Sequence, residues 1–205
     1  MTLLRPGGLA FSNMAGSKFA WVDVKVKKAD LTGLRESVKL LAESELLVGF
    51  PEGTTERPDD GSTPEITNAA LGYIHDHGAP ENNIPARPFM ISAIRENLSK
   101  VADLMEGLAV TALTKRSPLA VVKGLTQVGL FMATAIKRKI NEGIPPPLSD
   151  YTLRQRAGKG RKGAKEELLR RAKGENPSME FAKPLVDTGQ LRNAVNFVIR
   201  PRRRT

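Results

Sequence analysis

The longest helical pattern in the chain is FMISAIRENLSKVADLMEGLAVTAL, residues 89–113. Its apolar residues recur at spacings of three and four, which predicts a long α-helix with one apolar face. A second pattern of this kind covers about residues 118–141, after Ser117-Pro118, a pair typical of a helix cap and a first-turn proline. We expect the two helices to pack antiparallel and both apolar faces to lie in the core. These faces consist of Met90, Ile94, Leu98, Val101, Met105, Leu108 and Ala112 on the first helix and of Val122, Leu125, Val128, Met132, Ala135 and Ile140 on the second.

Short strands are predicted on both sides of this helical pair. Residues 20–28 alternate apolar and polar side chains, residues 45–50 form a short apolar run, and VNFVI (195–199) is typical of a last strand. The expected fold class is α+β, with a small, mostly antiparallel sheet packed by the two long helices and by shorter ones. Because side chains alternate along a strand, one face of the last strand should hold Val195, Phe197 and Ile199.

Shorter helices are predicted from apolar spacing and from cap residues. One covers residues 30–44. Another begins at Ser62 and should end at Gly78 in a left-handed cap. A further short helix is expected to start at Ser149. Near the end of the chain, Asp187 and Gln190 have capping-box spacing, and Gly189 between them is a turn position.

One α+β domain is expected over residues 20–199, with a flexible N-terminal arm (1–19) and a basic tail (200–205). Residues 157–180 include the run GKGRKGAK, and such a basic, glycine-rich composition favours a mobile loop within the domain. No apolar run reaches the roughly 18 residues of a membrane span. Because the chain has no cysteine, disulfides and thiolate metal sites are excluded, and a reducing compartment is expected.

The formal net charge of +10 favours anionic partners, either nucleic acid or acidic protein surfaces. The charge is segregated, because residues 52–65 hold five acids and one Arg whereas residues 151–175 hold nine Lys or Arg and three acids. Such a distribution suits copies of one protein that meet head to tail. Candidate contacts with a partner or with DNA are Glu52, Asp59, Asp60, Arg161, Lys162, Lys165, Arg202, Arg203 and Arg204.

The basic segment allows three interpretations, which the sequence leaves open. It could be a solvated loop, a contact with nucleic acid, or a contact with an acidic protein neighbour. Only Tyr151 adds an aromatic side chain to it, so base stacking has little support.

Both histidines of the chain, His75 and His77, lie in YIHDHGAPENNIPARPF (73–89) with Asp76 between them. A metal or acid–base site would use these three side chains, but residues two apart on a helix point about 200° apart and cannot grip one ion. The chain also lacks the motifs of zinc proteases, serine hydrolases and nucleotide-binding enzymes. We therefore interpret the stretch as a structural joint without metal or cofactor. The residues expected to shape it are Gly78, Pro85, Arg87, Pro88 and Phe89.

Three motifs follow one another along the chain. The first is LLVGFPEG (46–53) with YIHDHGAP and NIPARPFM behind it, the second is PPLSDYTLRQR (146–156), and the third is KPLVDTGQLRNAV (183–195). Their order and spacing over roughly residues 45–199 resemble the tail-completion and virion-morphogenesis proteins of tailed bacteriophages. This group is related to the HK97-type tail component and to the P2-type tail-completion protein.

The resemblance implies a structural, non-enzymatic protein of the phage neck or upper tail, which forms a ring around the DNA channel and joins the tail to the head connector. The partners it implies are further copies in a ring, such as a hexamer, and neighbouring neck and tail-tube proteins. Non-specific contact with DNA in the lumen is also expected, but no membrane. The location is the virion, after assembly in the host cytoplasm. The alternative function, from charge, is a sequence-nonspecific nucleic-acid-binding module; a hydrolase centred on His75 and His77 comes third.

Overall fold

The structure of the protein is a computed structural model that describes residues 31–51 and 66–203. Several sequence-based expectations lie outside these residues: the N-terminal arm (1–19), the strand at 20–28, the acidic segment 52–65 and the helix start at Ser62.

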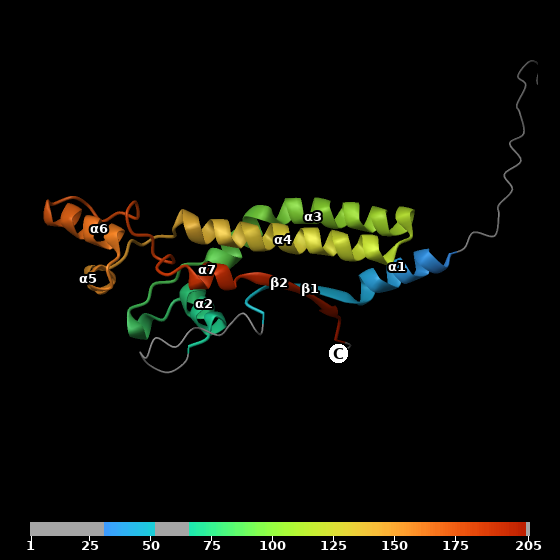
Figure 1. Ribbon diagram of the computed structural model, residues 1–205, viewed down its shortest axis with the longest axis horizontal. Helices are drawn as coiled ribbons and strands as arrows, with labels where there is room; N and C mark the ends of the chain where they lie inside the picture. Colours follow the sequence, from blue (N-terminus) through green and yellow to red (C-terminus); the bar gives the residue numbers. More distant parts are fainter. Residues whose placement is uncertain (1–30, 52–65, 204–205) are drawn as a thin grey trace, which may run out of the picture. The chain divides into compact units, whose positions relative to one another are not determined.

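The described residues form an α+β fold, as predicted, with mostly helical structure and a two-stranded antiparallel sheet. Figure 1 shows the elements in their arrangement. In chain order they are α1 (Thr32–Glu43), β1 (Ser44–Gly49), α2 (Asn68–His77), the 3-10 turn η1 (Pro80–Asn82), α3 (Phe89–Lys115), α4 (Pro118–Glu142), α5 (Asp150–Gly158), α6 (Lys162–Ala172), α7 (Gln190–Ala194) and β2 (Asn196–Pro201).

The two long helices α3 and α4 form the predicted antiparallel hairpin and run side by side (Figure 1). Their connection is short because Arg116 adopts a left-handed conformation, with φ of 48°, and Pro118 opens α4 at a first-turn position. Across the hairpin, Lys139 Nζ pairs with Glu96 and also lies 3.3 Å from Glu142 Oε2. The hydrogen bond from Lys139 to Glu96 raises the pKa of this lysine.

The sheet pairs β1, near the start of the described residues, with β2, near their end. Leu47 of β1 pairs with Val198 of β2 in an antiparallel register. Phe197 packs against Gly129 of α4, where an added Cβ would lie 2.4 Å from the phenyl ring. Ile199 also packs inward, whereas Val198 is exposed, so the predicted alternation along the last strand is confirmed.

Apolar side chains gather in three clusters. The central cluster contains Phe89, Ala93, Ala133, Ile136, Ile140, Leu185, Leu191 and Val195. The hairpin-tip cluster contains Leu108, Ala112, Val121 and Leu125, covered by residues of α1 and the sheet. The α5–α6 cluster contains Leu148, Leu153, Ala164 and Ala182.

The apolar face predicted for α4 is largely confirmed. Nine residues of α4 are buried, and of the predicted face only Val122 is exposed. By length and composition α4 would also suit a membrane span, and it is the one such helix among the described residues. In the fold it packs against α3, α1 and both strands of the sheet.

The apolar face predicted for α3 is wrong in part. Leu108 and Ala112 are buried, but Ile94, Leu98 and Met105 are exposed, Leu98 by 62%. The buried contacts at the start of α3 come instead from Phe89 and Ala93. The physical reason is that α3 packs mainly on α4 and α1, so the described fold covers only one side of it.

The mobile basic loop expected at residues 157–180 is also wrong. Residues 162–172 of this segment form α6, which packs against α5 around the α5–α6 cluster. Ala164 and Leu168 supply apolar surface at helical spacing on α6, and Ala157 adds to it from α5; the glycine-rich composition concealed this pattern. Gly158 and Gly160 fall at the turn between the two helices.

Two helix starts differ from the prediction. Helix α2 begins at Asn68, because the Thr67 hydroxyl accepts a hydrogen bond of 3.2 Å from the Ala70 amide. Helix α7 begins after Gly189, which has φ of 81°, and Asp187 does not cap it. The Asp187 carboxylate instead accepts a 2.8 Å hydrogen bond from Arg161. The start of α5 after Ser149 is confirmed, with a 3.2 Å hydrogen bond from the Thr152 amide to the Ser149 hydroxyl.

Candidate functional site

The connection between α2 and α3 is built around Asp76. This side chain is buried, and its Oδ1 accepts a 2.8 Å hydrogen bond from the Met90 amide. The carboxylate therefore satisfies one of the free amides in the first turn of α3, and its negative charge is favourable at that end of the helix dipole. Sequence reasoning assigned Asp76 only to an acid–base alternative and missed this capping role, because the contact spans fourteen residues.

The two histidines serve as parts of a packed helix end. His77 stacks on Tyr73 with 4.2 Å between ring centroids, and its Nδ1 lies 3.1 Å from the Tyr73 carbonyl oxygen. The carbonyl of His75 accepts a 2.7 Å hydrogen bond from the Arg87 amide. In residues 31–51 and 66–203, no three His, Cys, Asp or Glu side chains are grouped so that they could hold a metal ion.

Gly78 ends α2 by a conformation that favours glycine. Its amide donates to the Ile74 carbonyl over 2.7 Å, and its φ of 80° and ψ of 169° differ from the left-handed cap that the sequence predicted. An added Cβ would lie 2.7 Å from the Ala86 nitrogen. Both the conformation and the close approach therefore require glycine at this position.

The remaining predicted residues of this connection lead the chain into α3. Pro85 is exposed, Pro88 directly precedes the helix, and Phe89 is fully buried in the central cluster. Phe89 meets Phe50, at the end of β1, edge to face with 6.4 Å between centroids. The first motif is thus a packed joint in which β1 contacts the start of α3.

Two arginines link the three sequence motifs by binding backbone carbonyl groups. Arg87 is 5% exposed, and its Nη2 donates to the Pro146 carbonyl over 2.9 Å. Arg156 donates three hydrogen bonds of 2.7–2.9 Å to the carbonyl groups of Lys183, Pro184 and Val186. The second motif therefore contacts both the first and the third.

Burial lowers the pKa of both arginines, and for Arg87 the nearby charge of Arg156 adds to this effect. Asp187 acts in the opposite direction on Arg156. Sequence reasoning expected Arg87 to shape this joint but missed Arg156. The sequence signal for Arg156 was its place in the second motif, PPLSDYTLRQR (146–156), beside the apolar residues of α5.

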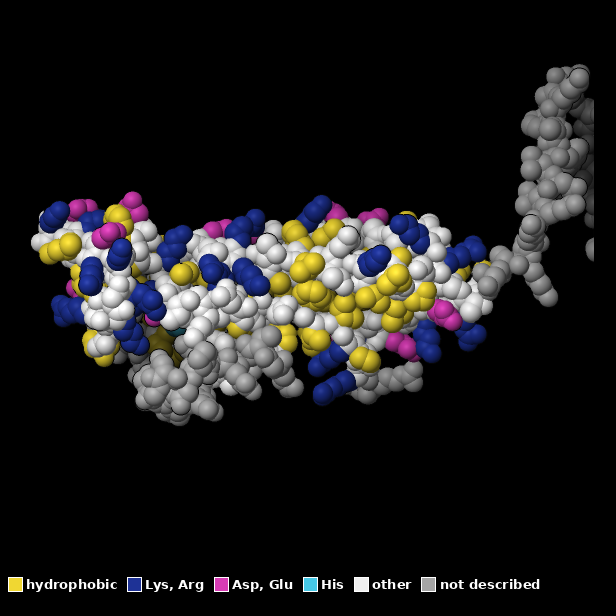
Figure 2. All heavy atoms as spheres, in the orientation of Figure 1, with side chains coloured by type: hydrophobic (Ala, Val, Ile, Leu, Met, Phe, Trp, Pro, Cys, Tyr) yellow, Lys and Arg dark blue, Asp and Glu magenta, His cyan; other side chains and the backbone are white. Residues whose placement is uncertain are grey.

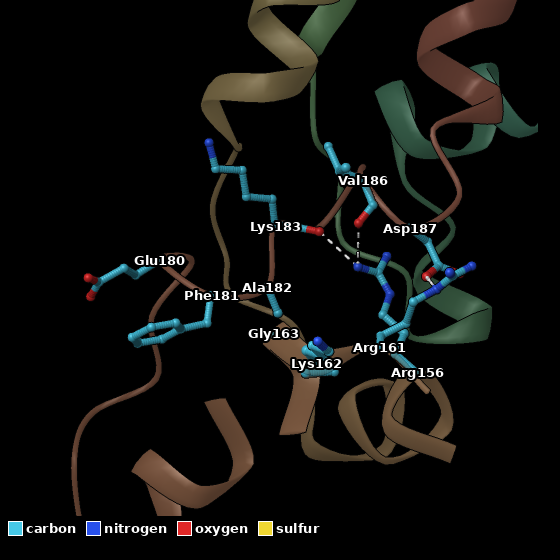
Figure 3. Close-up of a pocket in the computed structure, with 11 residues that line it drawn as sticks. Arg156, Arg161, Lys162, Gly163, Glu180, Phe181, Ala182, Lys183, Val186 and Asp187 are labelled. Carbon is cyan, nitrogen blue, oxygen red and sulfur yellow. Dashed lines mark hydrogen bonds and ion pairs between the residues drawn. The ribbon is translucent and has the colours of Figure 1, made fainter. Parts of the chain in front are cut away.

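A cavity of about 320 Å³ lies between α6 and the third motif (Figure 3). Arg161 and Arg156 form one side of it, Phe181 and Glu180 lie on the other, and Lys162 is between them. Gly163 also lines the cavity, and it approaches the backbone of Phe181 so closely that an added Cβ would lie 2.0 Å from the Phe181 carbonyl oxygen. The charged groups here are mixed, and Arg161 and Arg156 are already bound within the fold.

The predicted partner contacts fall into two groups. Lys162 and Lys165 are exposed on α6, whereas Arg161 forms an ion pair with Asp187 and supports the fold. Arg202 and Arg203 are exposed after β2, and the Arg202 amide extends the sheet by a 2.6 Å hydrogen bond to the Glu43 carbonyl. Outside the described residues lie Glu52, Asp59, Asp60 and Arg204, and their roles as contacts with a partner or with DNA stay predictions.

A buried carboxylate inside the basic segment escaped sequence reasoning. Glu167 is fully buried and accepts hydrogen bonds from Arg170, Arg171 and Ser178. Burial raises the pKa of Glu167, but these hydrogen bonds outweigh burial and lower the pKa to about 2. Arg171 also pairs with Asp150, so this network ties α6 to the start of α5.

No protein-family model, curated protein sequence or solved structure matches this chain.

Proposed function

We propose that this protein is a structural subunit of the neck or upper tail of a tailed bacteriophage. In this proposal its copies form a ring that completes the tail and joins it to the head connector around the DNA channel. It acts without catalysis, in the virion, after assembly in the host cytoplasm. The observation that supports it best is the convergence of the three motifs on one packed joint through Arg87, Arg156 and Phe89.

That convergence matters because these motifs carry the resemblance to tail-completion proteins. In the folded chain these motifs contact one another and form one structural unit. The polar groups of the joint also bind each other and the backbone. Asp76 holds α3, and Arg87 and Arg156 hold carbonyl groups, so the joint favours a rigid scaffold over a reacting centre.

The charged surfaces give the proposed ring a means of choosing its partners. Lys162 and Lys165 project from α6, and a neighbouring copy or an adjoining ring would offer the acidic segment with Glu52, Asp59 and Asp60. Such contacts mainly set partner choice and the rate of encounter. Arg161, the third cation of this group, also has a role inside the fold, because it forms an ion pair with Asp187.

The direct test is to image the purified protein by negative stain and to measure its native mass. Closed rings with a fixed number of copies are expected. A protein that stays monomeric at the concentrations at which tails assemble would contradict the proposal. In infected cells, the Lys162→Glu and Lys165→Glu double variant should reduce head–tail joining. The matched control is Arg154→Glu with Lys173→Glu, which reverses one exposed charge on α5 and one directly after α6.

The second candidate function is sequence-nonspecific binding of nucleic acid. It is favoured by the exposed cations of α5 and α6, for which the structure shows no ion pair within the described residues: Arg154, Lys159, Lys162, Lys165 and Lys173. Phosphate contacts of this kind weaken steeply with salt. A monomer that binds duplex DNA with a strong salt dependence, and forms no ring, would favour this function.

A further inference from the structure

Helices α5 and α6 belong to a part of the fold that has a core of its own. We define the α5–α6 lobe as residues 148–182. Its apolar cluster shares no residue with the central or the hairpin-tip cluster. The buried carboxylate of Glu167 also binds within the lobe, to Arg170, Arg171 and Ser178. Both the apolar and the polar contacts therefore hold the lobe together as a unit.

The boundary between the lobe and the rest of the described chain is thinly packed. Helices α5 and α6 pack mainly on each other, and Figure 1 shows both beyond the end of α4. After the lobe, the central cluster resumes only at Leu185. The cavity of about 320 Å³ lies at this boundary, with Phe181 and Ala182 on the lobe side and Val186 and Asp187 on the other (Figure 3). Space is therefore open where a fixed junction would hold close-packed side chains.

Two arginines hold the lobe across this boundary, and we call their contacts the arginine latch. Arg156 donates its three hydrogen bonds of 2.7–2.9 Å to carbonyl groups of the third motif. Arg161 Nε lies 2.8 Å from Asp187 Oδ1, but these side chains are 42% and 33% exposed, and exposed ion pairs contribute little. Arg156 is therefore the main tie. Small polar boundaries of this kind permit relative motion of the parts that they join.

The chain crosses the boundary twice, and each crossing is anchored on the side away from the lobe. Before the lobe, the Pro146 carbonyl accepts a 2.9 Å hydrogen bond from the buried Arg87 side chain. After the lobe, Lys183 Nζ donates to the Asn141 carbonyl near the end of α4. A rotation of the lobe therefore needs backbone changes only near residues 146–148 and 182–183. Hinges in proteins consist of a few such loop positions.

We propose that the α5–α6 lobe is a hinged unit, which the arginine latch holds closed and which turns as a rigid body when the latch opens. Figure 2 shows Lys and Arg side chains over this end of the fold, and the exposed ones include Lys162 and Lys165. The hinge therefore sets how far these cations reach toward a partner. The inference goes beyond the proposed function and does not depend on it, because the latch lies within one chain.

The test measures distances between pairs of spin labels by electron paramagnetic resonance. The chain has no cysteine, so cysteines introduced at exposed positions accept the labels. Leu130→Cys with Leu169→Cys reports across the boundary. Tyr151→Cys with Leu169→Cys reports within the lobe, and Leu98→Cys with Leu119→Cys reports along the hairpin. An excess of unlabelled protein is added so that distances between copies do not contribute.

Each pair should give one narrow distance distribution while the latch is intact. Arg156→Ala with Arg161→Ala should broaden the distribution across the boundary at least about twofold, because more orientations of the lobe become populated. The other two distributions should not change. The matched control is Arg154→Ala with Lys165→Ala, which removes two exposed cations of α5 and α6 with no ion pair among the described residues. This control should leave all three distributions narrow.

A distribution across the boundary that the latch variant does not broaden would overturn the inference. Broadening within the lobe or along the hairpin would also overturn it, because the chain would then lose structure instead of turning at a hinge. If the double alanine variant does not fold, Arg156→Lys with Asp187→Asn takes its place with the same expected result, since it removes the guanidinium fork and the ion pair but keeps the charge at residue 156. A fixed lobe would leave the proposed ring standing, and a monomeric protein would leave the hinge standing.

Discussion

Arg156 shows at the residue scale how one side chain can hold distant segments together. Its three hydrogen bonds end on the carbonyl groups of Lys183, Pro184 and Val186, in a segment that belongs to no helix or strand. Charge-assisted hydrogen bonds contribute more than neutral ones, and the carbonyl groups would be left without these partners after truncation.

We expect Arg156→Ala to lower the free energy of unfolding by about 3 kcal/mol, from the lost hydrogen bonds of a charged donor. The control is Arg154→Ala, two residues earlier on the exposed side of α5, which should change it by less than about 0.5 kcal/mol. Urea unfolding of both variants measures the difference. Equal stabilities would show that the carbonyl contacts of Arg156 contribute nothing measurable.

Glu167 should make the stability depend on acidity. Its pKa is about 2 in the folded protein and 4.5 as the ordinary value, so the folded state favours the ionised form. Its contribution is therefore fully present above about pH 4.5 and is lost as the pH falls toward 2. Glu167→Gln should destabilise the protein at pH 7 and should flatten the pH dependence between 4.5 and 2. Urea midpoints measured at several pH values check this, and an unchanged slope would contradict it.

At the element scale, glycines decide how closely helices approach their neighbours. Gly129 of α4 leaves space for Phe197 of β2, where a Cβ would lie 2.4 Å from the ring. Gly107, in the interior of α3, has no neighbouring atom within 4 Å of an added Cβ. The same substitution should therefore have opposite effects on the two helices.

We expect Gly129→Ala to destabilise the protein by about 1–3 kcal/mol, as overpacking against a ring does. Gly107→Ala should stabilise it by up to about 1 kcal/mol, because alanine is the better helix former. Thermal or urea unfolding of the two variants tests this. Stabilisation by both would mean that Phe197 moves aside freely and that β2 packs loosely on α4.

Sequence periodicity predicted the elements well but predicted their surroundings less well. The bounds of α3 and α4 and the alternation of Phe197 and Val198 followed from local spacing. Local spacing could not show that Leu98 faces outward, because an apolar row looks the same whether the chain itself or a partner covers it. Composition misled at α6, where glycines and lysines concealed Glu167 and its arginine partners.

The candidate site was predictable only in part for a similar reason. Gly78, Arg87 and Phe89 carry local signals of a turn, a donor and a core residue. Asp76 and Arg156 act over fourteen and about thirty residues of chain, and no local pattern reveals the atoms that they bind. Their roles emerge only when the motifs are placed in space.

At the scale of the whole molecule, the three apolar clusters should differ in local stability. The central and hairpin-tip clusters share α3, α4 and the sheet, whereas the α5–α6 cluster has four buried apolar residues of its own. Regions with few buried apolar contacts open most readily. Hydrogen exchange should therefore be faster in α5 and α6 than in α4, and Arg156→Ala should widen the difference. Equal protection in all three helices would show that the described fold opens as one unit.

The pairing of β1 with β2 sets the order in which the elements of a growing chain can fold during synthesis. Leu47 meets a partner that is synthesised about 150 residues later, so this long-range closure comes after the local α3–α4 hairpin can already form. Until the last strand leaves the ribosome, β1 has no strand to pair with and the surface of α4 at Gly129 lacks its contact with Phe197. A prematurely terminated chain would therefore lack the closing strand, and β1 would be left without its partner β2.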